Sequence, residues 1–135
     1  MEQGGVYLTD KNNFCKSNRN VAIIVPYRQR KTHLRIFINN IHRFLSRQKM
    51  NYGIYIIDQY GEDEFNRGLL INIGFLESIK DSINNQLNVS WNCFVFHDVD
   101  FIPENGRNIY KCSDKYPLHL ASSPQQGSQN LNWYL

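Results

Sequence analysis

The alternation of short apolar runs with longer amphipathic segments is the feature that most constrains how this chain folds. Three runs rich in β-branched and aromatic residues, at 21–25, 53–57 and 91–97, are typical of buried strands. Between them, apolar residues recur every three or four positions, as on one face of a helix: Leu34, Phe37, Ile38, Ile41 and Leu45, then Leu69, Leu70, Ile73, Leu76 and Ile79. This order predicts an α/β domain built on a parallel β-α-β-α-β core.

The ends of these elements follow from local residue chemistry. We expect Pro26 to end the first strand and Thr32 to cap the first helix. We expect the second helix to begin at Asn66, and residues 81–90, which are polar, to form an irregular connection to the third strand.

The two ends of the chain differ from its middle in composition. Residues 1–20 are polar and predict an irregular leader without the apolar core of a signal peptide. Residues 122–135 are rich in Ser, Gln and Asn and predict a divergent, disordered tail. A single domain over residues 21–121 is therefore expected. The chain contains no apolar run of membrane-spanning length. The net charge of +3 is dispersed, which argues against a nucleic-acid partner.

An Asp-Val-Asp triplet follows the third apolar run. In an extended chain the side chains of Asp98 and Asp100 point to one side, while those of His97 and Val99 point to the other. Two carboxylates on one side are suited to a hard divalent cation that also takes diphosphate oxygens. Two solvated loop carboxylates are the alternative. An aspartyl-nucleophile phosphatase is disfavoured, because its motif follows the first strand and continues into Gly and Thr.

Two further clusters follow the other strands. Pro26 to Arg30 leads from the first strand to a helix start, where arginines and free N–H groups attract phosphate. Phe65, Asn66 and Arg67 open the second helix with an aromatic ring, an amide and a guanidinium. In a parallel sheet these clusters and the Asp-Val-Asp triplet meet at one edge. The alternatives are exposed arginines on a capped helix, and a Phe65 that packs on its own helix.

Four segments in register resemble a known family. Residues 21–30, 52–59, 65–75 and 94–103 are similar to the N-terminal region of animal β-1,4-galactosyltransferases, and the resemblance extends over about residues 20–121. It implies a GT-A (Rossmann-like) nucleotide-diphospho-sugar transferase fold, a UDP-galactose donor, a Mn²⁺ cofactor and a glycan acceptor ending in N-acetylglucosamine. Since close relatives transfer GalNAc, a β-1,4-N-acetylgalactosaminyltransferase is an alternative. The resemblance also implies a location in the Golgi lumen or membrane, because family members are type II membrane proteins of that compartment.

The resemblance also implies roles for individual residues. Asp100 would ligate the metal, and the nucleotide-sugar site would comprise Pro26, Tyr27, Arg28, Gln29, Arg30, Phe65, Asn66, Arg67, Asp98, Val99 and Asp100. The chain departs from the family pattern at four of its positions, where the family has Phe, Asn, Asn and Ala: Tyr27, Gln29, Asp58 and Gly68.

Three cysteines leave at least one thiol unpaired within the chain. By the resemblance, Cys93 and Cys112 form a family disulfide, which would contribute about 3 kcal/mol in an oxidising compartment. Cys15 resembles a family cysteine whose partner lies further upstream. Asn88 begins an Asn-Val-Ser glycosylation sequon, which matters only if the chain is secreted.

The family segment that supplies the catalytic base, the gating Trp and further metal ligands has no counterpart here. We therefore expect a truncated chain that binds a UDP-sugar and Mn²⁺ weakly and transfers negligible sugar alone. A non-catalytic truncated isoform or a gene-model fragment is the second hypothesis. A cytosolic nucleotide-binding module is the third, and it would require Cys93 and Cys112 to stay reduced.

Overall fold

The computed structural model describes residues 6–8, 18–84, 89–103 and 106–120. Its elements are β1 (Val6–Tyr7), β2 (Asn20–Tyr27), α1 (Lys31–Ser46), β3 (Asn51–Asp58), α2 (Arg67–Asn84) and β4 (Cys93–Phe96). The strands form one sheet in the order β1-β3-β2-β4, in which β3 and β4 run parallel to β2. The predicted parallel β-α-β-α-β core is confirmed.

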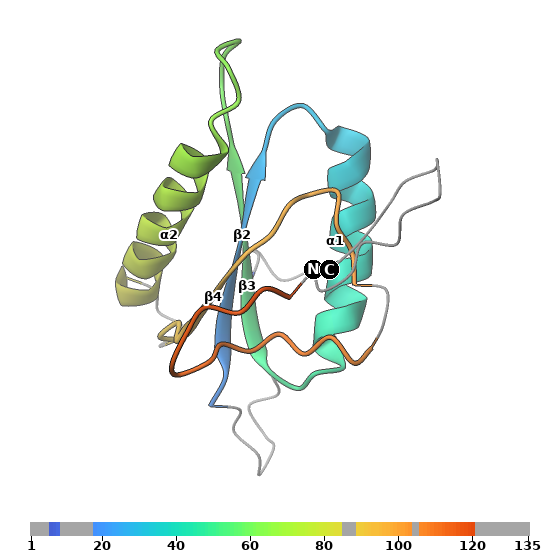
Figure 1. Cartoon of the computed structure of the whole chain (residues 1–135), viewed down its shortest axis with the longest axis vertical. Coiled ribbons are helices and arrows are strands. Elements are labelled where there is room, and N and C mark those ends of the chain that lie inside the picture. Colours follow the sequence, from blue (N-terminus) through green and yellow to red (C-terminus); the bar gives the residue numbers. More distant parts are fainter. Residues whose placement is uncertain (1–5, 9–17, 85–88, 104–105, 121–135) are drawn as a thin grey trace.

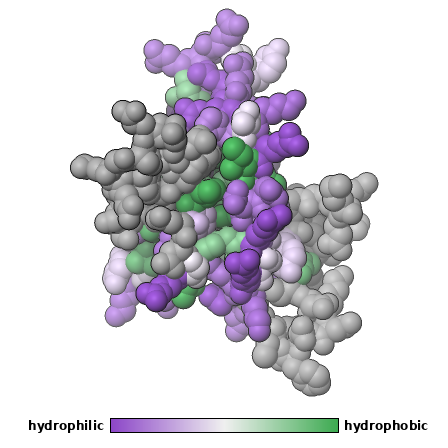
Figure 2. All heavy atoms as spheres, turned by 90° about the vertical axis from the view of Figure 1, so that its right-hand side faces the viewer, coloured by the Kyte–Doolittle hydropathy of each residue, from purple (hydrophilic) through white to green (hydrophobic). Residues whose placement is uncertain are grey.

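The sheet is covered by a helix on each face (Figure 1). Strand β2 lies at its centre, and its side chains alternate between the two sides. Val21, Ile23 and Val25 pack in the same core as Phe37, Ile41 and Leu45 of α1. Ala22 belongs to a second core with Val89 and Trp91. Figure 2 shows the side of the molecule that carries α1, where hydrophilic residues surround a smaller hydrophobic area at the centre.

Strand β2 continues past the point where the sequence predicted its end. Pro26 pairs with Ile57 of β3, whereas β4 pairs with β2 only as far as Ile24. The missing N–H of Pro26 therefore lies where β2 has one neighbour, a position that tolerates proline. Helix α1 then begins at Lys31 with Arg30 as its N-cap residue and no side-chain cap, so the predicted Thr32 cap is wrong.

Helix α2 begins as predicted but ends later. The side-chain oxygen of Asn66 accepts a hydrogen bond from the Leu69 N–H at 3.0 Å, which caps the helix. The helix runs to Asn84, so the prediction of irregular structure from residue 81 is wrong at its first four positions. The Tyr55 hydroxyl donates to Asp81 at 2.7 Å and anchors this last turn to the sheet.

The leader differs from its prediction, whereas the segment after β4 carries a predicted feature. Val6–Tyr7 pairs antiparallel with β3, and the Tyr7 ring stacks on Tyr52 at 5.0 Å, so the leader contains a short strand that the sequence did not predict. Cys93 and Cys112 form the expected disulfide, which ties the segment after β4 to the sheet. Cys15, Asn88 and residues 122–135 lie outside the described residues. No helix in the described part of the chain is both long and apolar enough to cross a bilayer.

Candidate functional site

A cleft of about 360 Å³ opens where β2 and β4 end. Carboxyl ends of neighbouring parallel strands are the usual ligand position in sheets of this kind. Strand order also reverses here, since β3 and β4 lie on opposite sides of β2. The lining comes from three segments that are far apart in sequence: Pro26, Arg28, Arg30, Phe65, Arg67, Asp98, Val99, Asp100 and Phe101.

The charges of the cleft are arranged as two ion pairs. Arg30 Nη1 lies 2.6 Å from Asp100 Oδ2, and Arg67 Nε lies 2.8 Å from Asp98 Oδ1. All four side chains are between about one third and one half exposed. Ion pairs this accessible to water contribute only about 0–1 kcal/mol each, so a ligand can exchange them readily.

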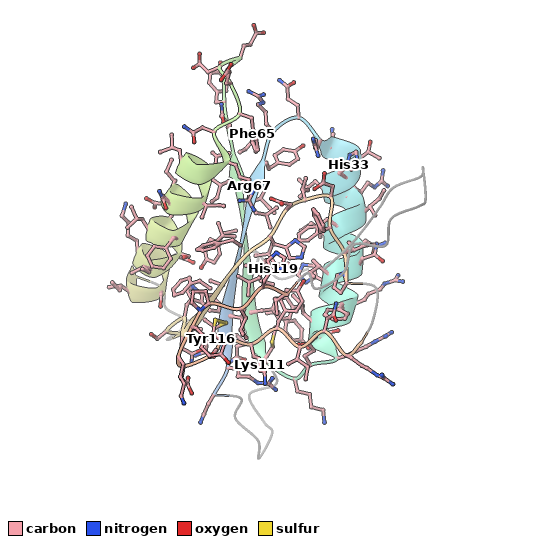
Figure 3. All side chains as sticks on the ribbon, viewed as in Figure 1. His33, Phe65, Arg67, Lys111, Tyr116 and His119 are labelled. Atoms are coloured by element: carbon pink, nitrogen blue, oxygen red, sulfur yellow. A yellow bond between two sulfur atoms is a disulfide. The ribbon has the colours of Figure 1, made fainter. Side chains whose placement is uncertain are left out.

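Arg28 has a different environment from the other two arginines. Its guanidinium donates to the Asp63 carbonyl and lies 5.5 Å from the centre of the Phe65 ring, within range of a cation–π contact. Phe65 is 42% exposed, so one part of its ring remains accessible from the cleft. Figure 3 shows Phe65 and Arg67 near the amino end of α2, away from Lys111 at the opposite end of the sheet.

Gln59 holds the loop that presents Phe65. Its side-chain oxygen accepts from the Asn66 N–H at 2.8 Å, and its side-chain nitrogen donates to the Glu64 carbonyl at 3.0 Å. Its own N–H donates to the Tyr27 carbonyl at 2.9 Å. Sequence reasoning missed this residue, because a single glutamine in a polar loop carries no spacing signal. It also missed Phe101, whose position next to the Asp-Val-Asp triplet could have indicated a lining role.

Three of the predicted site residues lie outside the cleft lining. Tyr27 is buried in the core on the α1 side. Gln29 is exposed and adopts the left-handed conformation, with φ of 50°, in the turn between β2 and α1. Asn66 caps α2. The other eight predicted residues line the cleft: Pro26, Arg28, Arg30, Phe65, Arg67, Asp98, Val99 and Asp100.

Burial around the Asp-Val-Asp triplet alternates as expected, but the chain is not extended there, because β4 ends at Phe96 and residues 99–100 form a turn, so Val99 lines the cleft together with both aspartates. His97 and Val99 are buried, with 1% and 4% exposure, while both aspartates reach the cleft. His97 Nδ1 lies 2.8 Å from the Asp98 carbonyl, so this nitrogen carries the proton, and Nε2 accepts from the Tyr110 hydroxyl at 2.8 Å. Burial lowers the pKa of His97 and raises that of Tyr110. His97 and Tyr110 are therefore both uncharged, and His97 holds the Asp98 backbone through its hydrogen bond to the carbonyl.

The side chains of the cleft could hold a hard divalent cation only if a bound phosphate group supplied further oxygen ligands. No group of three or more His, Cys, Asp or Glu side chains placed to hold a metal occurs among the described residues. The cleft itself supplies the carboxylates of Asp98 and Asp100. Mg²⁺ and Mn²⁺ take oxygen ligands and complete their shells with phosphate and water. A bound diphosphate could therefore complete a shell begun by Asp100.

A second cavity, of about 730 Å³, adjoins the cleft and shares Arg67, Asp98 and Phe101 with it. It extends along β4 and under the segment at residues 111–120. Its walls are mainly apolar, and the ion pair in its lining is the Arg67–Asp98 pair that it shares with the cleft. The cleft is the better candidate for a diphosphate that binds with a cation, because its lining combines three guanidinium groups with two carboxylates.

The chain matches a family model described as the N-terminal region of glycosyl transferase group 7, over residues 1–113. β-1,4-Galactosyltransferase 4 of Mus musculus is 48% identical over 107 residues, which are 79% of this chain and 29% of the mouse protein. β-1,4-Galactosyltransferase 2 of Homo sapiens is 44% identical over 107 residues, which are 79% of this chain and 27% of the human protein. The chain thus spans less than a third of the length of these curated relatives.

Solved structures agree with the sequence relatives. A mutant of Drosophila β-1,4-galactosyltransferase 7, in complex with manganese, UDP-Gal and xylobiose, matches with a TM-score of 0.58 and 30% identity. The match covers 76% of this chain and 38% of that one. The catalytic domain of the same Drosophila enzyme with xylobiose matches with a TM-score of 0.54 and 29% identity. The predicted GT-A fold and family are confirmed, and the chain belongs to glycosyl transferase group 7 and carries its N-terminal region.

Proposed function

We propose that the cleft binds the nucleoside diphosphate of a nucleotide sugar, UDP-galactose, together with Mn²⁺. The observation that carries this proposal is the convergence of Arg28, Arg30 and Arg67 with an exposed aromatic ring and two carboxylates in one cleft. Guanidinium groups bind phosphate oxygens through charge-assisted hydrogen bonds. The Phe65 face offers a stacking surface for a base. A relative of this chain was solved with manganese and UDP-Gal bound, which supports the same ligand class here.

The charged residues of the cleft have two roles in this binding. Arg28, Arg30 and Arg67 contact the diphosphate or ribose, and Asp100 ligates the cation. In a transferase, such groups stabilise charge on the leaving diphosphate, and the cation supplies Lewis-acid stabilisation of the same charge. The arginines are held before a ligand arrives, since each already has a partner in the structure.

Transfer to an acceptor also needs a base that takes the proton of the acceptor hydroxyl. In the described part of the chain, the carboxylates of the cleft are those of Asp98 and Asp100, and both are paired with arginines. His97 is buried and engaged on both ring nitrogens. We therefore propose that this 135-residue chain binds UDP-galactose but transfers galactose to N-acetylglucosamine inefficiently. We also propose that it belongs to the Golgi, as expected for this family.

Calorimetric titration of UDP in the presence of Mn²⁺ tests the binding proposal. Replacing Arg28 by alanine should weaken UDP binding at least about tenfold, the effect of losing one charged hydrogen bond. Replacing Arg35, which is exposed on α1 and does not line the cleft, should leave the affinity unchanged. Equal losses in both variants would contradict the assigned site. In a radiolabelled transfer assay with UDP-galactose, robust turnover by this chain would contradict its proposed inefficiency.

A further inference from the structure

We propose that two copies of this chain associate through the outer face of α2, with the two helices antiparallel. The face is a stripe of exposed side chains, here called the α2 seam, formed by Leu69, Ile73, Leu76, Lys80 and Ile83. None of these side chains lines the cleft or the cavity along β4. The association is therefore independent of the nucleotide site, and its test does not depend on ligand binding.

The spacing of the α2 seam is that of a helix–helix contact. Its members follow one another in steps of four, three, four and three residues, which keeps them on one face of a helix. The same spacing defines the a and d positions through which paired helices contact each other. Four of the five members are apolar, and those four are between 39% and 77% exposed. A continuous exposed stripe of this kind marks an interaction surface, whereas scattered apolar residues do not.

The opposite face of α2 is also apolar and already packs on the sheet. Leu70 is 5% exposed, and the Phe75 ring lies 4.7 Å from that of Phe94 on β4. The backbone of Gly74 approaches the side chains of the sheet closely. Figure 1 shows no described segment on the outer side of α2. A helix that is apolar on all sides is normally buried on all sides, so the outer face of α2 lacks a cover.

Helix α1 shows what an exposed helix face is like elsewhere in this chain. Its exposed residues are all polar: Lys31, Thr32, Arg35, Asn39, Asn40, Arg43 and Ser46. The outer face of α1 is therefore unsuited to cover the α2 seam of a second copy. The α2 seam of that copy has the matching apolar stripe, and a two-fold pair of identical surfaces is the commonest arrangement in protein dimers.

Lys80 determines the orientation of the pair. Within one copy its ammonium lies 2.6 Å from the Glu77 carboxylate. In a parallel pair the two Lys80 side chains would lie in one layer and repel each other. In an antiparallel pair centred on Leu76, Lys80 lies beside the partner's Ile73. Because helical side chains lean towards the amino end of their own helix, Lys80 then reaches towards the partner's Glu77. The charges of the α2 seam are thus complementary to those of an antiparallel copy.

The same arrangement brings the apolar members together. Leu76 meets the partner's Leu76 at the two-fold axis, and Leu69 lies opposite the partner's Ile83. Five residues from each copy form a small contact, compared with about 20–30 residues a side in a standard interface. We therefore expect a weak dimer, with a dissociation constant of about 10–100 μM.

Sedimentation equilibrium of the chain between about 1 and 200 μM, a range that spans this dissociation constant, measures the association. The average mass of the wild type should rise with concentration from that of a monomer towards twice that value. Leu76→Glu places two like charges at the two-fold axis and should weaken the association at least about tenfold. Ile109→Glu is the matched control, because Ile109 is also exposed, at 47%, and lies outside α2. It should leave the association unchanged.

An exchange of charges tests the antiparallel orientation. Lys80→Glu places two carboxylates across the α2 seam, and Glu77→Lys places two ammonium groups there. Each variant alone should associate about fivefold more weakly than the wild type. An equimolar mixture of the two variants should associate as tightly as the wild type, because every Glu then faces a Lys. A variant that merely folds poorly would not recover in the mixture.

The outcomes decide the inference. Weaker association of Leu76→Glu, an unchanged control and recovery in the mixture support it. A wild type that stays monomeric across the whole range overturns it and leaves the α2 seam to an occupant outside these 135 residues. A dimer that Leu76→Glu leaves intact also overturns it, because another surface would then hold the copies together. Failure of the mixture to recover overturns the antiparallel pair.

Discussion

Replacing Gly74 by alanine is expected to destabilise this domain, even though alanine forms helices better than glycine. Gly74 lies in α2 where the helix crosses the sheet. A Cβ at this position would lie 2.5 Å from Cγ2 of Ile24 and 2.8 Å from Cγ1 of Ile57. Ile24 is fully buried on β2, between β3 and β4, so its methyl group cannot move aside without shifting the sheet.

Two opposing effects set the magnitude. Alanine gains about 1 kcal/mol over glycine inside a helix. One extra carbon in a packed interface costs about 1–3 kcal/mol in strained side chains and backbone. The clash here is with β-branched side chains on the sheet, so we place its cost at about 2 kcal/mol and the net loss of unfolding free energy at about 1 kcal/mol. In a chain of this size that loss lowers the melting temperature by roughly 3–5 °C.

Gly68→Ala provides the matched control on the same helix. A Cβ there meets only the Asn66 side-chain oxygen, at 3.9 Å. This variant should therefore gain stability, by about 0.5 kcal/mol, from helix propensity alone. Urea unfolding followed by circular dichroism measures both changes. If both variants were stabilised equally, α2 would not pack as closely on the sheet as described, and its placement of Arg67 against Asp98 would be in doubt.

Three further predictions concern a turn, a buried histidine and the disulfide. Gln29→Asn should raise stability by about 0.5 kcal/mol in urea melts, because asparagine tolerates the φ of 50° better, and a loss would contradict this conformation. Since burial lowers the pKa of His97 below 6.5, the unfolded chain binds a proton more readily, and stability should fall as the pH drops below about 6.5. His97→Gln should show a smaller fall than the wild type between about pH 7 and 5, and an equal fall would exclude His97 as its source. Reducing the Cys93–Cys112 disulfide should lower the unfolding free energy by about 3 kcal/mol, with Cys112→Ser reproducing the loss, whereas a change below about 1 kcal/mol would show that the bridge restrains little.

The sequence predicts the core of this fold well, because the apolar residues that form the core recur with the periods of strands and helices. The apolar run at 21–25 becomes the centre of β2, buried on both faces, and Phe37, Ile41 and Leu45 form the buried stripe of α1 as their spacing indicates. The features that the sequence did not predict depend on contacts with distant residues. Strand β1 exists through its pairing with β3, and the last turn of α2 is held by a hydrogen bond from Tyr55 to Asp81.

The candidate site shows the same division. The placement of the arginine, aromatic and aspartate clusters follows from the rule that ligands bind beyond the carboxyl ends of parallel strands. The clusters do meet in one cleft. The sequence could not show that Arg30 and Arg67 pair with Asp100 and Asp98, since those partners are 70 and 31 residues away. It also gave no sign that Gln59 fixes the loop carrying Phe65, because a single glutamine in a polar loop belongs to no recognisable spacing pattern.

Chemical-shift mapping of the ¹⁵N-labelled chain during titration with UDP and Mg²⁺, a diamagnetic substitute for Mn²⁺, tests the central claim most directly. The amide signals expected to move belong to the β2–α1 turn, the start of α2 and residues 98–101, three segments that line one cleft. Shifts confined to those segments and saturating together would support one diphosphate and cation site. Shifts confined to the cavity along β4 and residues 111–120, or no shifts at saturating UDP, would contradict it.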